Sequence, residues 1–572
     1  MPIYDINNVF QEEGALTWTH ATHNVKFGAG VIRRQMNYYQ IQNGTGQFTW
    51  SGATAGGPPN SLANFLLGIP TTITRQFPYQ FQYYRIWEPH VYVQDDWHVT
   101  RKLALNIGLR WDHIGQLASA TGQRSNYQLD SNSFCIGDYA CVEPNWKQFQ
   151  PRFGYAYSAG KGFVLRGGFG MSYFAQDYAS GSLNLANPPF VTVNFTCSPA
   201  ALTGSSVCPA GVGTLSQGPP PIVPPNIAQL LGPVAGGLNS QLAAHSDYYP
   251  GAKVMELNFT LQKQVGASVF TAAYVGELGR HLQYSWNANQ PVPSGSAVTP
   301  SYLRVTTLPN ITNITLYGTG GASEYNAAQF IFERRYSKGI TVNANYVFNR
   351  NLTSLTDLGG AEPIATLVNN RSYDWGNSSI GFKHKITARI NYELPFGKSG
   401  GRLTKTALGG WQANAIAFWQ SGEPYTILDG QNLINLPNTT TDRPNQIAGQ
   451  SCQAAQPTIH DWVNYNAFQQ QAIGQPGNEG RAQCYGPHWK SVDLSLFKVF
   501  QFHERYRLSF RAEAYNISNT PNFSLPNNTI AAWTVKNSPA GIPTNAAGFG
   551  QITSTNIGFT PRVMQLALKL LF

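Results

Sequence analysis

The last twelve residues, PRVMQLALKLLF (Pro561–Phe572), have the pattern of a strand that lies between lipid and water. Every second position is apolar, in the order Met564, Leu566, Leu568, Leu570 and Phe572. The opposite positions include Gln565 and Lys569. Successive side chains of a strand point to opposite faces, so one face is apolar and the other is partly polar. A soluble, buried strand does not need such a face, whereas a membrane-crossing strand with a wet interior does.

The same alternation recurs along the chain, for example in residues 103–112, 340–349 and 507–514. It predicts fifteen strands, at residues 14–20, 23–40, 83–98, 103–114, 149–159, 163–174, 256–265, 268–283, 324–337, 340–352, 379–395, 409–425, 491–502, 506–519 and 561–572. Several are longer than the roughly ten residues that a tilted strand needs to cross a bilayer. We therefore predict an all-β fold, an antiparallel transmembrane β-barrel.

The connections between these strands alternate in length. Short ones lie at residues 100–101, 160–162, 266–267, 338–339 and 503–505, and long ones at 41–82, 115–148, 175–255, 284–323, 353–378, 426–490 and 520–560. Outer-membrane barrels have short periplasmic turns and long extracellular loops, which predicts the orientation of the chain. A periplasmic C-terminus then requires residues 549–553 to belong to the last long loop rather than to another strand.

The composition supports this class and excludes others. Of 572 residues, 12% are charged and 13% are aromatic, which contradicts intrinsic disorder. The net charge of +10 is scattered, so it does not form the concentrated basic patch of a nucleic-acid-binding protein. The chain has no run of about 18 apolar residues, so we expect no membrane helix. Its start at Met1 lacks the basic and apolar regions of a signal peptide.

Six cysteines form three local pairs. The pairs are Cys135 with Cys141, Cys197 with Cys208, and Cys452 with Cys484. None has the CxxC spacing of a metal or redox site. All six lie in long connections, and we expect them to form disulfides in an oxidising compartment, with reduced loop cysteines as the alternative.

The sequence predicts no catalytic, cofactor or metal site. Asp95 and Asp96 are adjacent in a strand and point to opposite faces, so they cannot act as a facing acid–base pair. His20 and His23 could bind a metal only if a turn folds them together, and we expect no carboxylate or Cys nearby, so we interpret that segment as a plain turn. Polar-face residues can contact a solute, but we expect them mainly to hold interior water; they include Arg110, Asn343, Arg511 and Glu513. We expect substrate specificity to reside in the long loops.

Several phrases together resemble a known family. They are YVQDDWHVTRKLALNIGLRWD (Tyr92–Asp112), YVGELGRHL (Tyr274–Leu282), FERRYSKGITVNANYVFNR (Phe332–Arg350), YELPFGK (Tyr392–Lys398), GGW (Gly409–Trp411), DLSLFKVF (Asp493–Phe500) and FRAEAYNISNTPNF (Phe510–Phe523). In this order they resemble the Oar-like group of TonB-dependent transporters, over residues 1–572. The resemblance implies a 22-stranded barrel in the outer membrane, closed by an N-terminal plug. It also implies that the TonB complex of the inner membrane acts on that plug, so that a solute too large for porins passes.

The chain departs from this plan in its first residues. No segment before Ala15 has the pattern of a plug, a TonB box or a signal peptide, so fifteen strands would correspond to the last fifteen of 22. We therefore expect a barrel that is incomplete at its N-terminus and that meets the TonB complex only through the missing plug region. The alternatives are a passive porin, an adhesin-like barrel without a plug, and a secreted soluble β-protein.

The terminal aromatic residue predicts one further partner besides lipid. Phe572, in register with the apolar row from Met564 to Leu570, resembles the signal that the barrel-assembly machinery reads. The pattern does not identify the solute, and siderophore, cobalamin, oligosaccharide and peptide remain open.

Overall fold

A computed structural model describes most of the chain. The described ranges are 3–40, 43–51, 60–76, 81–115, 117–174, 251–288, 313–354, 370–397, 401–431, 442–502, 506–535 and 540–572, with the short pieces 187, 190, 194–197, 208, 213–219, 241–245, 248–249, 290, 367 and 433–434. Among these residues, no helix has both the length and the apolar character that crossing a membrane requires.

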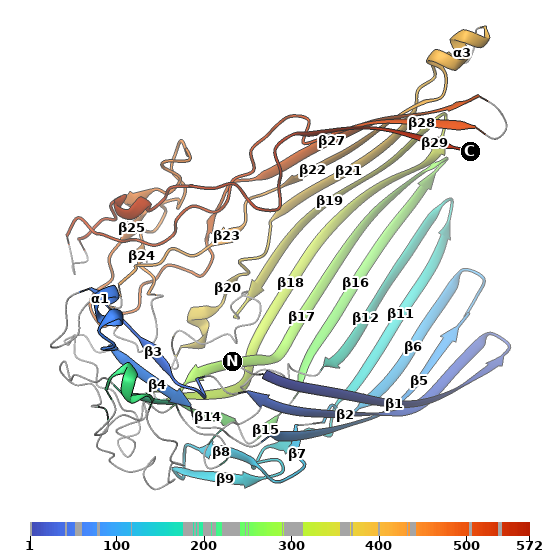
Figure 1. Cartoon of the computed structure of the whole chain (residues 1–572). Helices are drawn as coiled ribbons and strands as arrows, with labels where there is room; N and C mark the ends of the chain where they lie inside the picture. Colours follow the sequence, from blue (N-terminus) through green and yellow to red (C-terminus); the bar gives the residue numbers. More distant parts are fainter. Residues whose placement is uncertain are drawn as a thin grey trace.

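Within the described residues, fifteen long strands form one curved sheet, with the first and last of them at its two margins (Figure 1). They are β1 (Ile3–His20), β2 (His23–Gln40), β5 (Gln82–Trp97), β6 (Leu103–Asp112), β11 (Phe149–Gly160), β12 (Phe163–Phe174), β16 (Ala252–Val265), β17 (Ser268–Asn287), β18 (Asn313–Ser337), β19 (Ile340–Thr353), β21 (His384–Glu393), β22 (Trp411–Gln420), β27 (Trp489–Gln501), β28 (Arg507–Tyr515) and β29 (Val563–Leu571). Each long strand pairs antiparallel with the next one along the chain. The predicted number and order of strands are confirmed.

The remaining elements are short and lie mostly in the long connections. They are β3 (Gln47–Thr49), α1 (Ser61–Leu66), β4 (Thr72–Gln76), β7 (Ala118–Ser119), β8 (Arg124–Gln128), β9 (Ser133–Gly137), β10 (Glu143–Pro144), β13 (Asn194–Cys197), β14 (Gln241–His245), β15 (Tyr248–Tyr249), β20 (Gly376–Asn377), α3 (Arg402–Leu408), β23 (Pro424–Tyr425), β24 (Asn445–Gln446), β25 (Phe468–Gln469) and β26 (Cys484–Tyr485). Single 3-10 turns occupy Leu215–Gln217, Arg371–Asp374, Tyr465–Ala467 and Ala546–Gly548. Three of these strands, β7, β14 and β20, bring the main sheet to 18 strands.

The short turns gather at one end of the sheet and the long connections at the other (Figure 1). Some predicted boundaries were wrong. Strand β1 begins at Ile3 instead of residue 14, because pairing with β2 extends along its polar first half. Strands β17 and β18 continue into the predicted loop 284–323, and helix α3 occupies the turn before β22. The predicted turn 503–505 lies outside the described residues.

The register carries the apolar face of β29 across the whole sheet. Leu566 pairs with Ala512, which pairs with Leu496 on the next strand. Met564, Leu566 and Leu568 are 74%, 75% and 69% exposed. The same face exposes large apolar side chains on other strands, among them Phe27, Val93, Ile107, Phe153, Phe169, Leu257, Phe270, Phe330 and Ile386. Such a wide exposed apolar band is the surface that a barrel presents to lipid.

Two long connections fold together at the other end of the strands. The described residues of 421–488 and 516–562, here called the loop body, share a buried core. Its members include Tyr425, Ile427, Phe468, Ile530 and Phe549. Phe549 is fully buried in that core and residues 549–553 form no strand, as predicted. The loop body is therefore a packed unit.

Candidate functional site

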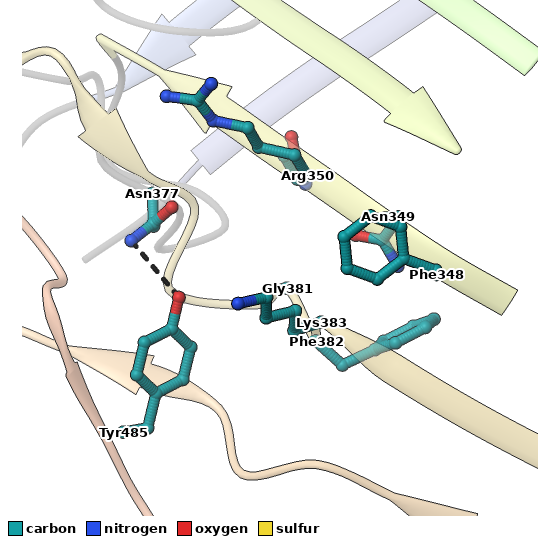
Figure 2. Close-up of a pocket in the computed structure, with 9 residues that line it drawn as sticks. Phe348, Asn349, Arg350, Asn377, Gly381, Phe382, Lys383 and Tyr485 are labelled. Atoms are coloured by element: carbon teal, nitrogen blue, oxygen red, sulfur yellow. Dashed lines mark hydrogen bonds between the residues drawn. The ribbon is translucent and has the colours of Figure 1, made fainter. Parts of the chain in front are cut away.

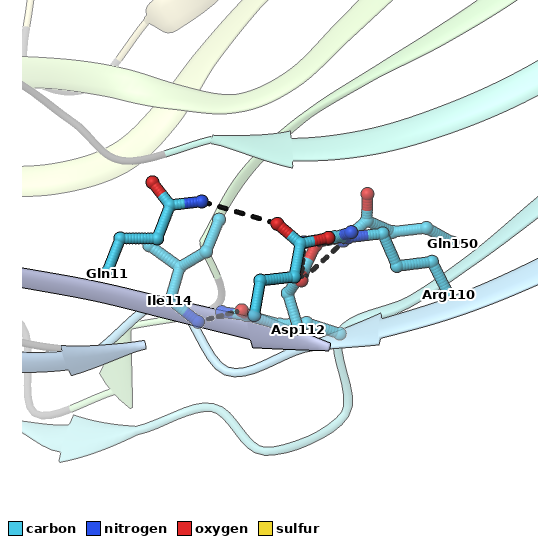
Figure 3. A network of polar contacts seen from close by, with 7 residues as sticks. Gln11, Arg110, Asp112, Ile114 and Gln150 are labelled. Carbon is cyan, nitrogen blue, oxygen red and sulfur yellow. Dashed lines mark hydrogen bonds and ion pairs between the residues drawn. The ribbon is translucent and has the colours of Figure 1, made fainter. Parts of the chain in front are cut away.

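The polar face of the sheet carries charged side chains that pair with their neighbours. Arg110 Nε donates to Asp112 Oδ1 at 2.8 Å and to Oδ2 at 2.9 Å, and Gln150 Nε2 donates to the same carboxylate (Figure 3). On adjacent strands, Arg34 Nε donates to Glu88 Oε2 at 3.0 Å. These pairs keep the face polar, as is typical of a wet barrel interior.

The other polar residues singled out in the sequence behave in the same way. Asn343 Nδ2 donates to Glu333 Oε1 at 3.2 Å, and Arg511 lies 3.8 Å from Glu513. The structure distributes them over separate strands and does not bring them together with Arg110. A solute site built from these predicted residues alone is therefore not formed.

The prediction that no carboxylate lies near His23 was wrong. His23 Nδ1 lies 2.7 Å from Asp95 Oδ2, because β2 pairs with β5 and places these residues beside one another. Asp96 instead accepts a hydrogen bond from Asn106, on the opposite face of the strand. Within the described residues, no group of three or more His, Cys, Asp or Glu side chains is placed to hold a metal ion.

Disulfides stabilise the long connections. Cys135 is bonded to Cys141, and Cys452 is bonded to Cys484. For the third predicted pair, the side chain of Cys197 lies outside the described residues, and Cys208 is disulfide-bonded. The bond between Cys452 and Cys484 closes a 32-residue separation inside the loop body and so restricts its unfolded state.

A cavity opens where β19 and β21 separate near the long connections (Figure 2). Pairing of β19 stops at Phe348, opposite His384, and resumes at Leu352, opposite Asn377. Residues 349–351 of β19 thus lie opposite residues 378–383. The second segment is three residues longer, so it bulges away from the sheet, as at other irregular strand pairings. The bulge encloses about 290 Å³.

Backbone hydrogen bonds hold this bulge in place. Asn349 N donates to Lys383 O at 2.9 Å, and Ser378 N donates to Asn351 O at 3.0 Å. Lys383 N donates to Ser421 Oγ at 3.0 Å, which connects the bulge to the loop body. The cavity is therefore a fixed feature of the wall.

The loop body supplies one wall of this cavity through Tyr485. Asn377 Nδ2 donates to Tyr485 Oη at 3.5 Å and to Ala482 O at 2.8 Å. Burial raises the pKa of Tyr485, and the nearby charge of Arg350 opposes that rise. The prediction of a continuous strand over residues 379–395 missed the cavity. Glycines at 376 and 381 were the available signal, since glycine inside a strand pattern often marks a bulge.

A second cavity of about 400 Å³ lies along the polar face beside the first. Its lining includes Gln329, Asn345, Lys385 and Thr387, and it shares Phe382 with the first cavity. The Nζ atom of Lys385 lies 5.2 Å from the centroid of the Phe382 ring. Phe382 therefore separates two neighbouring polar spaces.

The loop body also buries three carboxyl groups. Burial raises the pKa of Asp429 to about 6, that of Asp442 to about 6, and that of Glu479 to about 8. The Arg443 guanidinium opposes the rise at Glu479 without cancelling it. Asp429 Oδ1 accepts a hydrogen bond from Trp533 Nε1 at 2.7 Å, which joins the two connections of the loop body. The stability of this unit therefore depends on pH.

A wide apolar face, a polar opposite face and long connections at one end define a membrane barrel wall. The family model described as outer membrane beta barrel domain matches residues 1–565. The chain belongs to this family. An outer-membrane barrel places the apolar band against lipid and the charged pairs toward the interior. None of the curated proteins matches its sequence.

Solved structures to which this chain is similar include outer-membrane transporters and receptors. The outer membrane transporter YddB from Escherichia coli is 13% identical, with a TM-score of 0.50, over 100% of this chain and 55% of that protein. The ferric enterobactin receptor PfeA from Pseudomonas aeruginosa is 11% identical, with a TM-score of 0.45, over 99% and 54%. The siderophore receptor PiuA from Acinetobacter baumannii is 10% identical, with a TM-score of 0.43, over 99% and 56%. The chain spans about half the length of these proteins.

Proposed function

We propose that this chain forms the barrel of a TonB-dependent, Oar-like outer-membrane transporter, which takes up a solute too large for porins. The supporting observation is the packed loop body beside a rigid cavity at the long-connection end of the wall. A passive pore has no need of an ordered loop unit with its own core and disulfide, whereas a receptor needs a preformed surface for its solute.

Uptake measurements in cells test this proposal. The gene is deleted and restored, and uptake is measured for labelled ferric siderophore, cobalamin, dextrin oligosaccharide and peptide, with and without a proton uncoupler. We expect gene-dependent uptake of at least one probe, abolished by the uncoupler. Gene-dependent uptake that the uncoupler does not change would instead identify a passive porin. No gene-dependent uptake of any probe would favour an adhesin-like barrel.

The orientation and the assembly of the barrel belong to the same proposal. We place the C-terminus in the periplasm, with the long connections and their cysteines outside the cell. The Phe572 side chain is 91% exposed beyond the end of β29, where the barrel-assembly machinery can reach it. Phe572→Ser should lower the amount of folded barrel in the outer membrane.

An epitope tag after residue 572 tests the orientation of the barrel. The tag should become accessible to antibody only in permeabilised cells, and labelling of intact cells would refute this orientation.

A further inference from the structure

The polar lining of the β19–β21 cavity consists of hydrogen-bond donors and amides, without a carboxylate. Arg350 and Lys383 contribute two cations, and Asn349, Asn351 and Asn377 contribute amides. Neither cation forms an ion pair within the described part of the chain. Arg34 and Arg110, by contrast, each have a carboxylate partner. Two uncompensated cations at one fixed cavity favour an anionic ligand.

A buried donor points to the same kind of ligand. Asn349 is 4% exposed, and its Nδ2 atom has no hydrogen-bond partner among the residues that the structure describes. A buried polar group without a partner is costly, so native proteins rarely retain one without a reason. Asn349 lines the cavity beside Arg350. An acceptor oxygen placed there would satisfy the Nδ2 atom in a cavity whose lining also includes the two cations.

We propose that this cavity binds an oxyanion, a phosphate or carboxylate group carried by a larger molecule. The inference rests on the proposed function, since it names the chemical class of the solute that the receptor would take. A cavity of about 290 Å³ holds a phosphate or a sugar phosphate but not a whole drug-sized ligand. The rest of the solute would extend past Phe382 into the second cavity, where Lys385 and Thr387 offer further donors.

The oxyanion has two possible sources, because residues of both faces of the wall line the cavity. Asn349 and Asn351 alternate with Phe348 and Arg350 along β19, so one pair belongs to the polar face and the other to the apolar face. A solute in the interior would approach from the polar face. The phosphate of a lipopolysaccharide would approach from the apolar face.

Binding of defined probes to the purified full chain in detergent micelles tests the site. Glucose 6-phosphate and glucose are titrated by isothermal calorimetry, and lipopolysaccharide retention is measured by native mass spectrometry. We expect binding of glucose 6-phosphate or lipopolysaccharide, but no binding of glucose. Glucose 6-phosphate binding identifies a solute and lipopolysaccharide retention identifies lipid. Binding of neither, or equal binding of glucose, overturns the proposal.

Charge-removing variants locate the binding. Arg350→Gln and Lys383→Gln should each weaken binding roughly fivefold, and the double variant roughly twentyfold or more, since each removes one charge-assisted contact. Lys569→Gln, on the polar face of β29 far along the sheet, is the matched control and should leave affinity unchanged. An equal loss in Lys569→Gln would show a general charge effect and overturn the site.

Asn349→Leu separates binding from structure. Removing a buried donor without a partner should maintain or raise resistance to thermal unfolding, while binding falls at least fivefold. A variant that unfolds earlier would show that Asn349 serves the fold, which contradicts its assignment to the ligand. If these variants lose glucose 6-phosphate binding but cellular uptake is unchanged, the cavity is refuted as the site of the transported solute, and the proposed transport function still stands.

Discussion

Replacing Glu479 by glutamine should make the stability of the loop body much less dependent on pH. The Glu479 side chain is buried, and burial raises its pKa from 4.5 to about 8. The unfolded chain therefore releases this proton at a lower pH than the folded chain does. Stability is retained at low pH and is lost as pH rises from about 4.5 through about 8, because ionisation then favours the unfolded state.

The size of the effect follows from the pKa difference. Each pKa unit corresponds to about 1.4 kcal/mol. The free-energy penalty that Glu479 imposes on the folded loop body corresponds to about one pKa unit at pH 5.5 and about 3.4 units at pH 8.5. The penalty therefore grows by about 3 kcal/mol, which is roughly 200-fold in the equilibrium constant for opening of the loop body. Glu479→Gln removes this penalty and leaves a carbonyl oxygen for Ile427 N, which donates to Glu479 Oε1 at 3.5 Å. The pKa of about 8 already includes the attraction to Arg443, so the gain of about 3 kcal/mol is net of that attraction.

Amide hydrogen exchange of peptides within residues 442–486 measures this opening, with times corrected for the intrinsic effect of pH. Wild type should lose protection between about pH 5.5 and pH 8.5, and Glu479→Gln should retain most of it. Asp461→Asn, at an exposed position of the same unit, is the control and should follow wild type. If Glu479→Gln loses as much protection as wild type, or is the less protected protein at pH 8.5, the reasoning fails.

Three other perturbations test the packing. Lys498 is 2% exposed, and its Nζ donates to Ala407 O at 2.8 Å at the end of helix α3. Lys498→Met should therefore lower the free energy of opening of α3, measured by amide hydrogen exchange, by about 1–3 kcal/mol, while the strands stay protected. Cys452→Ser should destabilise the loop body by about 3–4 kcal/mol and speed proteolysis inside it, whereas an unchanged cleavage rate would argue against the bond's role. Leu566→Arg should cost about 2–4 kcal/mol in folding into lipid vesicles, more than Ala567→Arg on the polar face, and equal costs would contradict the assignment of faces.

The architecture was predictable from the sequence because its signal is local. Apolar and polar residues alternate with a period of two within each strand, as in residues 564–572. This pattern can be recognised without knowing which strand pairs with it. The alternation of short and long connections can also be recognised directly along the sequence. It sufficed to identify the strand count and to exclude residues 549–553 from the sheet. Boundaries were harder, since the polar first half of β1 becomes strand only through its pairing with β2.

The candidate site was decided by contacts between residues far apart in the chain. Asp95 reaches His23 only because β5 pairs with β2, and the β19–β21 cavity exists only because β19 and residues 378–383 lose their register. The burial of Glu479, which sets the pH response, depends on a core assembled from two separate connections. The sequence alone determined that this chain crosses the outer membrane as a barrel wall, since the alternation of side chains is local. Only the tertiary structure decided where unpaired donors meet, since burial and register are properties of the assembled sheet.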